Sequence, residues 1–247
     1  QSGLIHLNHA GVGPWPKCTA EAIMQFANEN SHKSTQNISR WEQVEAKLRQ
    51  LCKQLINAEN TNDIAFIKNT SEGLSIVAYG IPWKPNDNIV FAQQEFPSNR
   101  VIWQSLQPRF SVEARSVDLY QAPTPEDALF KQVDQNTRLI AVSAVQYATG
   151  LRMDLAKISE YCQAHNILLC VDAIQILGAI PFDLTDTPAD FVIADGHKWL
   201  LSPEGIGLFY CNPKIREQLN LNQYGWHMLE NLENFESLEW KPTNNAR

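Results

Sequence analysis

The sequence lacks the patterns that identify a membrane, nucleic-acid-binding or disulfide-stabilised protein. No apolar run reaches the roughly 18 residues of a membrane span, so no membrane partner is expected. Acidic residues outnumber basic ones, 27 against 20, and the net charge of −7 argues against nucleic acid as a partner. The five cysteines are scattered and form no C-x-x-C pair. Reduced thiols, a cytoplasmic location and no metal site are therefore predicted.

Two nucleotide-binding patterns are also missing. No G-x-G-x-x-G follows the first predicted strand, which argues against a nicotinamide dinucleotide site. No G-x-x-x-x-G-K-[ST] occurs either, which argues against a P-loop. A ligand that carries phosphate would therefore need a different kind of cradle in this chain.

Apolar, β-rich runs alternate with helical patterns along most of the 247 residues. Several runs are continuously apolar, which is typical of a parallel sheet with helices on both faces. The sequence thus predicts an α/β fold of three layers, a mostly parallel seven-stranded sheet between helices. The last two strands are joined by a short connection, so one antiparallel pair is expected there. The predicted strands are 63–67, 88–92, 111–117, 138–144, 167–172, 190–194 and 205–211.

Polar residues follow the first predicted strand and open a helical pattern. Ligands of parallel sheets bind beyond the carboxyl ends of the strands, so residues at these positions are candidates for a site. Thr70 and Ser71 would offer hydroxyl groups beside the free N–H groups of a helix N-terminus, which suit a phosphate. The simpler interpretation is that one of them only caps the helix.

A carboxylate and a lysine follow two later strands. Asp172 ends an apolar run, where an unpaired carboxylate would be costly, and Gln175 comes three residues later. Lys198 follows an apolar run and a glycine, and a lysine in such surroundings has a lowered pKa and serves as a nucleophile. The alternatives are a carboxylate satisfied by backbone donors, a lysine that reaches solvent, and His197 as an ordinary core residue.

Phe96 follows the second predicted strand and adds an aromatic face to this edge, although it could equally be a core residue. A phosphate cradle, an acid, an aromatic face and a lysine together suit a pyridine aldehyde phosphate. The acid would keep the ring nitrogen protonated, and the lysine would hold the aldehyde as an imine.

Several stretches resemble the class V aminotransferase-like family of pyridoxal 5′-phosphate enzymes. This fold-type I family includes cysteine desulfurases, selenocysteine lyases, isopenicillin N epimerases and kynureninases. The resemblance covers nearly the whole chain, and these motifs together are specific for the cofactor. The stretches are "LNHAGVGPWP", "NTSEGLS", "QEFPSN", "VQYATGLRMDL" and "VDAIQILGAIPFDL…ADFVIADGHKWLLSPEGIGLFY".

The resemblance implies a role for each candidate residue. Lys198 would form the internal aldimine and move a proton at the α-carbon of the substrate. Asp172 would pair with the pyridinium nitrogen, Gln175 would lie near the phenolic oxygen, and Phe96 would stack on the ring. The remaining implied contacts are the phosphate (Thr70, Ser71, His197), the cofactor at a position where relatives often have asparagine (Gln146), and the substrate (Asn8, His9).

Two residues depart from the pattern of the family. Many desulfurases have histidine where this chain has Phe96, which weakens a desulfurase assignment. Relatives commonly have a phosphate-binding serine where this chain has Asp195, and a carboxylate would repel a phosphate. Asp195 is therefore expected to point away or to pair with a basic group.

The resemblance also implies a division of the chain. Residues 1–35 would approach the substrate, 36–215 would form the large cofactor-binding domain, and 216–247 would lead towards a C-terminal small domain that this fragment lacks. A homodimer that acts on an amino acid by transamination or a related α/β-elimination is expected. The alternatives are a cysteine desulfurase or selenocysteine lyase, a non-catalytic module of the same fold, and a binding domain for another phosphorylated ligand.

Overall fold

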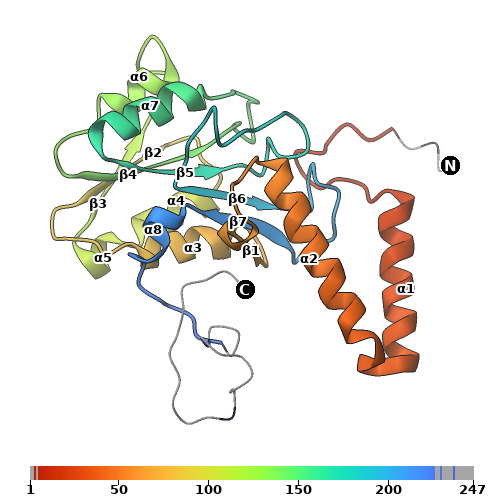
Figure 1. Cartoon of the computed structure of the whole chain (residues 1–247). Coiled ribbons are helices and arrows are strands. Elements are labelled where there is room, and N and C mark those ends of the chain that lie inside the picture. The colour runs from red at the N-terminus through yellow and green to blue at the C-terminus, as the bar shows by residue number, and fades with distance from the viewer. Residues whose placement is uncertain (1–2, 4, 226–228, 230–235, 237–247) are drawn as a thin grey trace.

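The computed structural model describes residues 3, 5–225, 229 and 236 (Figure 1). Seven strands form one sheet in the order β1-β7-β6-β5-β4-β2-β3. The strands β2 to β6 are paired in parallel, whereas β7 runs antiparallel to both of its neighbours. The strands are β1 (Ile64–Ile67), β2 (Asn88–Ala92), β3 (Glu113–Val117), β4 (Thr137–Ser143), β5 (Leu168–Asp172), β6 (Phe191–Asp195) and β7 (Gly207–Cys211).

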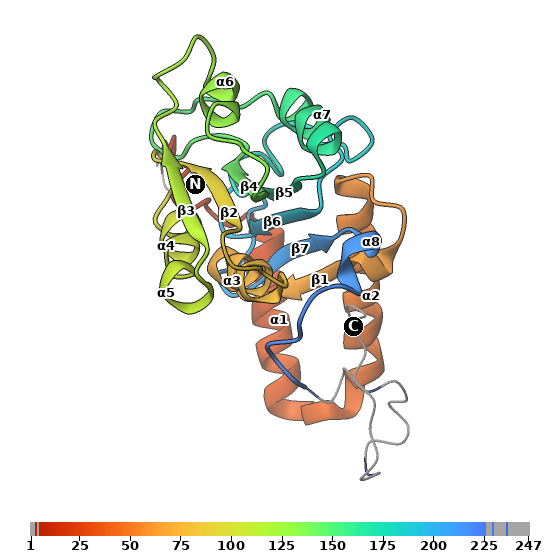
Figure 2. The ribbon, with the colours of Figure 1, turned by 90° about the vertical axis from the view of Figure 1, so that its left-hand side faces the viewer.

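Helices cover both faces of the sheet (Figure 2). Alternate residues of the buried strands point to opposite faces, so that Val90 and Ala92 join one apolar core and Ile89 and Phe91 the other. The three-layer α/β fold is therefore confirmed, with the antiparallel pair of the last two strands. One core packs against α6 (Pro125–Phe130) and α7 (Leu155–His165), the other against α3 (Thr70–Gly80) and α4 (Ser98–Gln104), which α5 (Gln107–Phe110) follows.

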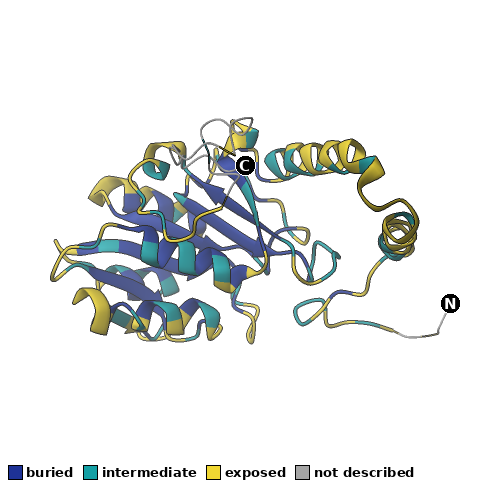
Figure 3. Cartoon of the chain, turned by 90° about the horizontal axis from the view of Figure 1, so that it is seen from below, coloured by how far each residue is buried: buried dark blue, intermediate teal, exposed yellow. Residues whose placement is uncertain are grey.

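The first two long helices form a hairpin that extends from the sheet (Figures 1 and 3). A 3₁₀ turn, Ser34–Asn37, joins α1 (Lys17–Lys33) to α2 (Ile38–Leu55), and neither helix contains a buried residue. A second 3₁₀ turn, Thr61–Asp63, leads into β1, and the short α8 (Pro213–Arg216) follows β7. Within the described part of the chain, no helix is long and apolar enough to span a membrane.

The strand register defines one edge of the sheet as the place for a ligand. Ser143 at the end of β4 pairs with Asp172 at the end of β5. At the same edge, β6 ends and β7 begins with the pair Asp195 and Gly207, and Ile67 at the end of β1 also pairs with Gly207. The carboxyl ends of β1, β4, β5 and β6 therefore lie together, and α3 begins three residues after β1.

Candidate functional site

Lys198 lies in the turn that connects β6 to β7, and the N-terminal segment covers this turn. The side chain of Lys198 is buried, although its neighbours in the sequence belong to a loop. The backbone N–H of Gly13 donates a hydrogen bond of 2.8 Å to the carbonyl of His197. A Cβ atom at Gly13 would lie 2.1 Å from the carbonyl oxygen of Lys198, so this close approach requires glycine.

Lys198 and Asp172 interact electrostatically at the sheet edge. Burial lowers the pKa of Lys198, whereas the charges of Asp172 and Asp195 raise it. Burial raises the pKa of Asp172 to about 7, and the charge of Glu95 raises it as well. The backbone N–H of Ile174, 3.1 Å from the Asp172 carboxylate, and the charge of Lys198 act in the opposite direction. The lowered pKa expected for Lys198 is confirmed, and its partner is a carboxyl group that titrates near neutrality.

Phe96 provides an aromatic face at this edge. The ammonium nitrogen of Lys198 lies 5.7 Å from the centroid of the Phe96 ring. The ring is 45% exposed and meets Tyr147 edge to face at 5.2 Å. Phe96 is therefore not a core residue, and its exposed ring suits a planar group bound beside Lys198.

The start of α3 carries the expected hydroxyl groups, and another residue caps the helix. The side chain of Asn69 accepts a hydrogen bond of 2.9 Å from the N–H of Glu72. Ser71 donates to the hydroxyl of Ser98 at 2.8 Å, and Thr70 accepts a 3.2 Å bond from the N–H of Asp195. Because Asn69 is the cap, the hydroxyl groups of Thr70 and Ser71 are not needed for that purpose.

Asp195 pairs with the neighbouring basic residue, as expected. Its Oδ2 atom lies 3.1 Å from Nδ1 of His197, which is within ion-pair distance, although this Nδ1 makes no hydrogen bond within the described residues. The second oxygen, Oδ1, is buried and makes no hydrogen bond within the described part of the chain. A buried carboxylate oxygen thus belongs to the residue whose backbone N–H contacts Thr70 at the start of α3.

Gln175 connects the N-terminal segment to the turn between β6 and β7 that contains Lys198 (the lysine turn). Its side-chain amide donates a 2.9 Å hydrogen bond to the carbonyl of Ala10, and its oxygen accepts one of 2.9 Å from the Trp199 indole. His9 stacks on the Trp199 ring at 5.2 Å, and Asn8 accepts a hydrogen bond from the N–H of Gly11. The predicted substrate residues therefore border the lysine turn, and their roles remain predictions.

Glu95 is a member of this site that the sequence did not indicate. Its carboxylate accepts hydrogen bonds from the Ser143 N–H at 2.7 Å, from the Ser143 hydroxyl, and from the Gln146 amide at 3.1 Å. The hydrogen bond to Glu95 thus holds Gln146 at the edge of the sheet that the carboxyl ends of the parallel strands form (the cofactor edge). The available signal was the position of this glutamate, directly before Phe96 in "QEFPSN".

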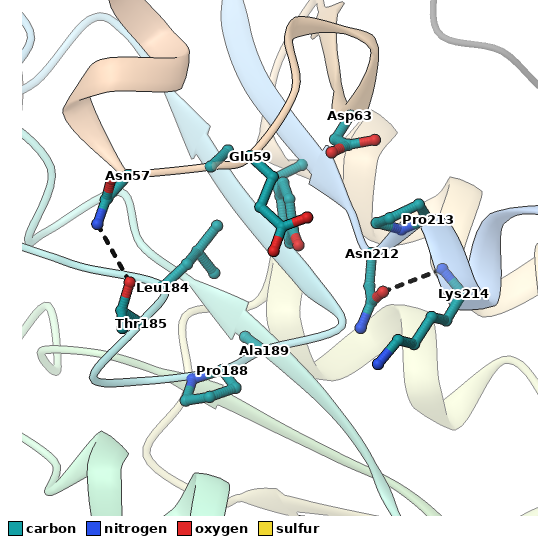
Figure 4. A pocket seen from close by; sticks show the side chains of 12 residues that line it. Asn57, Glu59, Asp63, Leu184, Thr185, Pro188, Ala189, Asn212, Pro213 and Lys214 are labelled. Atoms are coloured by element: carbon teal, nitrogen blue, oxygen red, sulfur yellow. Dashed lines mark hydrogen bonds between the residues drawn. The ribbon is translucent and has the colours of Figure 1, made fainter.

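The opposite edge of the sheet has a separate cavity of about 310 Å³ (Figure 4). Its lining includes Glu59, Asp63 and Lys214, and none of the predicted cofactor residues. Across the described residues, no group of histidine, cysteine and carboxylate side chains is suited to hold a metal ion. All five cysteines, each in the described part, are free thiols.

The residues at the cofactor edge fit pyridoxal phosphate. The start of α3 and His197 provide donors for a phosphate, Phe96 provides a ring face, and Asp172 provides a carboxyl group beside the lysine. Asp195 has the wrong charge for a phosphate cradle, as has Glu72 in the first turn of α3, which pairs with Lys68. The geometry thus brings together Thr70, Ser71, Phe96, Gln146, Asp172, Gln175, His197 and Lys198.

Known proteins resemble this chain in sequence. A probable cysteine desulfurase of Borreliella burgdorferi is 28% identical over 239 residues, which cover 93% of this chain and 56% of the relative. An isopenicillin N epimerase of Streptomyces clavuligerus is 27% identical over 230 residues, which cover 90% of this chain and 57% of the relative. The chain therefore spans little more than half the length of these relatives.

Solved structures and a family model extend this similarity. The cystine C-S lyase C-DES, in complex with its reaction product cysteine persulfide, matches with a TM-score of 0.88 at 25% identity. The match covers 99% of this chain and 65% of that one. The model of the aminotransferase class-V family matches residues 5–246, and the chain belongs to this family.

Proposed function

We propose that the chain is the cofactor-binding part of a pyridoxal-phosphate-dependent enzyme that acts on an amino acid. The observation that carries this proposal is the buried pair of Lys198 and Asp172 beside the exposed ring of Phe96. Bound pyridoxal phosphate supplies an electron sink for the charge that develops at the α-carbon of an amino acid.

Each residue at the edge has a defined task in this proposal. Thr70, Ser71 and His197 bind the phosphate through hydroxyl, backbone and ring N–H groups. Phe96 orients the pyridine ring, and Asp172 holds a proton at the ring nitrogen. Lys198, whose pKa is lowered by burial, removes and returns the proton at the α-carbon.

The reaction class that we propose is transamination or a related α/β-elimination. A cysteine desulfurase or selenocysteine lyase is the second candidate, because the sequence is similar to cysteine desulfurases over most of its length. Phe96 stands where many desulfurases have histidine, so acid–base chemistry at that position would need another group. Asn8 and His9, on the segment that covers the lysine turn, are the proposed substrate contacts.

The division of the chain and its assembly belong to the same proposal. Residues 1–35 approach the substrate, 36–215 bind the cofactor, and 216–247 lead towards a further domain. Of this last segment, 226–228, 230–235 and 237–247 lie outside the described residues. The enzyme is proposed to work as a cytoplasmic homodimer, since the resembling family is dimeric, and sedimentation of the purified protein tests the dimer.

An absorbance titration tests the cofactor. Purified protein mixed with pyridoxal phosphate is expected to develop a visible band between about 410 and 430 nm, which Lys198→Ala abolishes. Lys157→Ala removes a lysine of α7 that pairs with Asp127 and leaves Lys198 unaltered, so this control retains the band. No band in the unaltered protein would exclude the proposed enzyme and favour a binding module for another ligand.

Product analysis separates the reaction classes. Cysteine is offered together with a keto acid, and sulfide, alanine and new amino acids are quantified. With a thiol reductant present to reduce the released sulfur, sulfide and alanine in equal amounts identify a desulfurase, and sulfide with pyruvate and ammonia identifies β-elimination. Conversion of a keto acid other than pyruvate into its amino acid identifies transamination. A full-length protein that shows the band but makes no product from any amino acid contradicts the enzymatic reading and supports the non-catalytic module. Residues 1–247 alone are expected to be inactive or nearly so.

A further inference from the structure

Glu95 lies in the loop that joins β2 to α4, between the end of a fully buried strand and the ring of Phe96. Its side chain is 3% exposed, and this burial raises the pKa of its carboxyl group, whereas hydrogen bonds from Ser143 and Gln146 lower it. Charged groups at such depth are rare unless hydrogen bonds or opposite charges stabilise them. None of the tasks assigned above to the cofactor edge uses this residue.

Hydrogen bonds fix Glu95 to the end of β4. Both carboxylate oxygens are used, one by the Ser143 N–H and the Gln146 amide, the other by the Ser143 hydroxyl. These donors lie 48 and 51 positions later in the sequence. The loop that presents Phe96 is therefore tied to the strand beside Asp172, so the anchor restricts where the ring of Phe96 can lie.

The anchor also brings a second carboxyl group close to Asp172. Ser143, which binds Glu95, is the register partner of Asp172, and the N–H of Ala144 donates to the Asp172 carbonyl at 2.9 Å. The groups that act on Asp172 are Glu95 from the β2–α4 loop, Lys198 from the β6–β7 turn, and the N–H of Ile174. Cys170 on the same strand is buried, and its pKa is raised well above the usual range, so it stays neutral.

We propose that Glu95 is a positioning residue of the lysine site, which fixes Phe96 beside Lys198 and places a second carboxyl group beside Asp172. The carboxylates of Asp172 and Glu95 and the ammonium group of Lys198 then lie at the same buried edge of the sheet. Their excess negative charge stabilises one more proton there, on Asp172. In the proposed enzyme this proton is the one that Asp172 holds at the ring nitrogen, so the role in catalysis rests on the proposed function. The effect of Glu95 on the pKa of Asp172 does not rest on the proposed function, because this effect exists without the cofactor.

Carbon-13 NMR of aspartate carboxyl groups in the cofactor-free protein measures this effect. The Asp172 signal is assigned with Asp172→Asn, and its titration is followed in the unaltered protein and in Glu95→Gln. Burial and the charge of Glu95 together raise the pKa of Asp172 to about 7, so removing the negative charge of Glu95 is expected to lower this pKa. An Asp172 titration that is unchanged in Glu95→Gln overturns the proposal.

Glu126 provides the matched control. It is also a buried carboxylate that accepts a backbone N–H, that of Asp154 at 2.8 Å, but it lies on α6 and is not among the charges that act on Asp172. Glu126→Gln is expected to leave the Asp172 titration unchanged. A shift of the same size in this variant would show a general response to lost buried charge and would also overturn the proposal.

The anchoring part of the proposal has its own measurement. Ser143→Ala removes one donor to Glu95 and keeps the carboxylate, so the charge effect persists while the loop is loosened. Its dissociation constant for pyridoxal phosphate is expected to rise several-fold, because the ring face is less well fixed. Unchanged affinity in a folded Ser143→Ala protein contradicts the anchoring role. If neither the unaltered protein nor Ser143→Ala binds pyridoxal phosphate, the proposed function fails, whereas the NMR result on Asp172 is unaffected.

Discussion

At the scale of single residues, Asp195 departs from the pattern that the resemblance to the family implies. Its Oδ1 atom is buried without a hydrogen bond in the described region, and its backbone N–H contacts Thr70 at the start of α3. The resemblance implies a serine here that binds the phosphate. A carboxylate at this place repels a phosphate, and pairing with His197 offsets this repulsion only in part.

Asp195→Ser is therefore expected to tighten the binding of pyridoxal phosphate. Removal of one negative charge beside a phosphate is expected to lower the dissociation constant by about 10- to 100-fold at low ionic strength. Fluorescence titration at two salt concentrations measures the change, and the gain should shrink at high salt. Asp195→Glu, which keeps the charge, is the control. If Asp195→Ser weakens binding instead, Asp195 supports the cradle through His197 rather than opposing the phosphate.

At the scale of elements, the N-terminal segment stabilises the lysine turn through backbone contact. Gly13→Ala places a methyl group 2.1 Å from the carbonyl oxygen of Lys198 and 2.8 Å from a Leu201 methyl carbon, so one of the two segments must shift. We expect at least a tenfold loss of pyridoxal-phosphate affinity, with the main unfolding transition of the sheet domain nearly unchanged.

A second glycine serves as the control for this prediction. Gly80, the last residue of α3, has neighbours no closer than 3.6 Å to an added Cβ, so Gly80→Ala should leave cofactor affinity unchanged. Binding titration and thermal unfolding of both variants check the expectation. Equal affinities for Gly13→Ala and the unaltered protein would mean that the N-terminal segment does not control the position of Lys198.

Local patterns predicted the elements well, but not the contacts between distant segments. All seven strands and the lysine, carboxylate and aromatic positions after them follow from apolar runs and the residues that end them. The pairing of β1 with β7 joins residues 140 to 146 positions apart, and no local signal specifies it. The same holds for the hydrogen bonds of Glu95 with Ser143 and of Gln175 with Ala10, which depend on how separate segments meet.

At the scale of the whole molecule, stability is divided between the sheet and the helical hairpin. The strands β2, β5, β6 and β7 consist of buried residues, and their side chains form the two cores. The hairpin of α1 and α2 has no buried residue, although its ring contact between Phe26 and Trp41 and the ion pair of Arg40 with Glu29 hold it together. Such exposed ion pairs and single ring contacts contribute little stability.

Hydrogen exchange followed by mass spectrometry should therefore show two populations of amides. Segments with few buried contacts open locally at low free energy, so α1 is expected to exchange at least 100-fold faster than β4 and β5 at the same pH and temperature. Pyridoxal phosphate should slow exchange at the lysine turn and in residues 8–13, because Gly13 and Gln175 join these segments. It should leave α1 unchanged, since none of the cofactor residues lies on that helix. Protection of α1 equal to that of β5 would show instead that another molecule packs against the hairpin in solution. If this protection increases with protein concentration, the molecule that packs against the hairpin is a second copy of the chain.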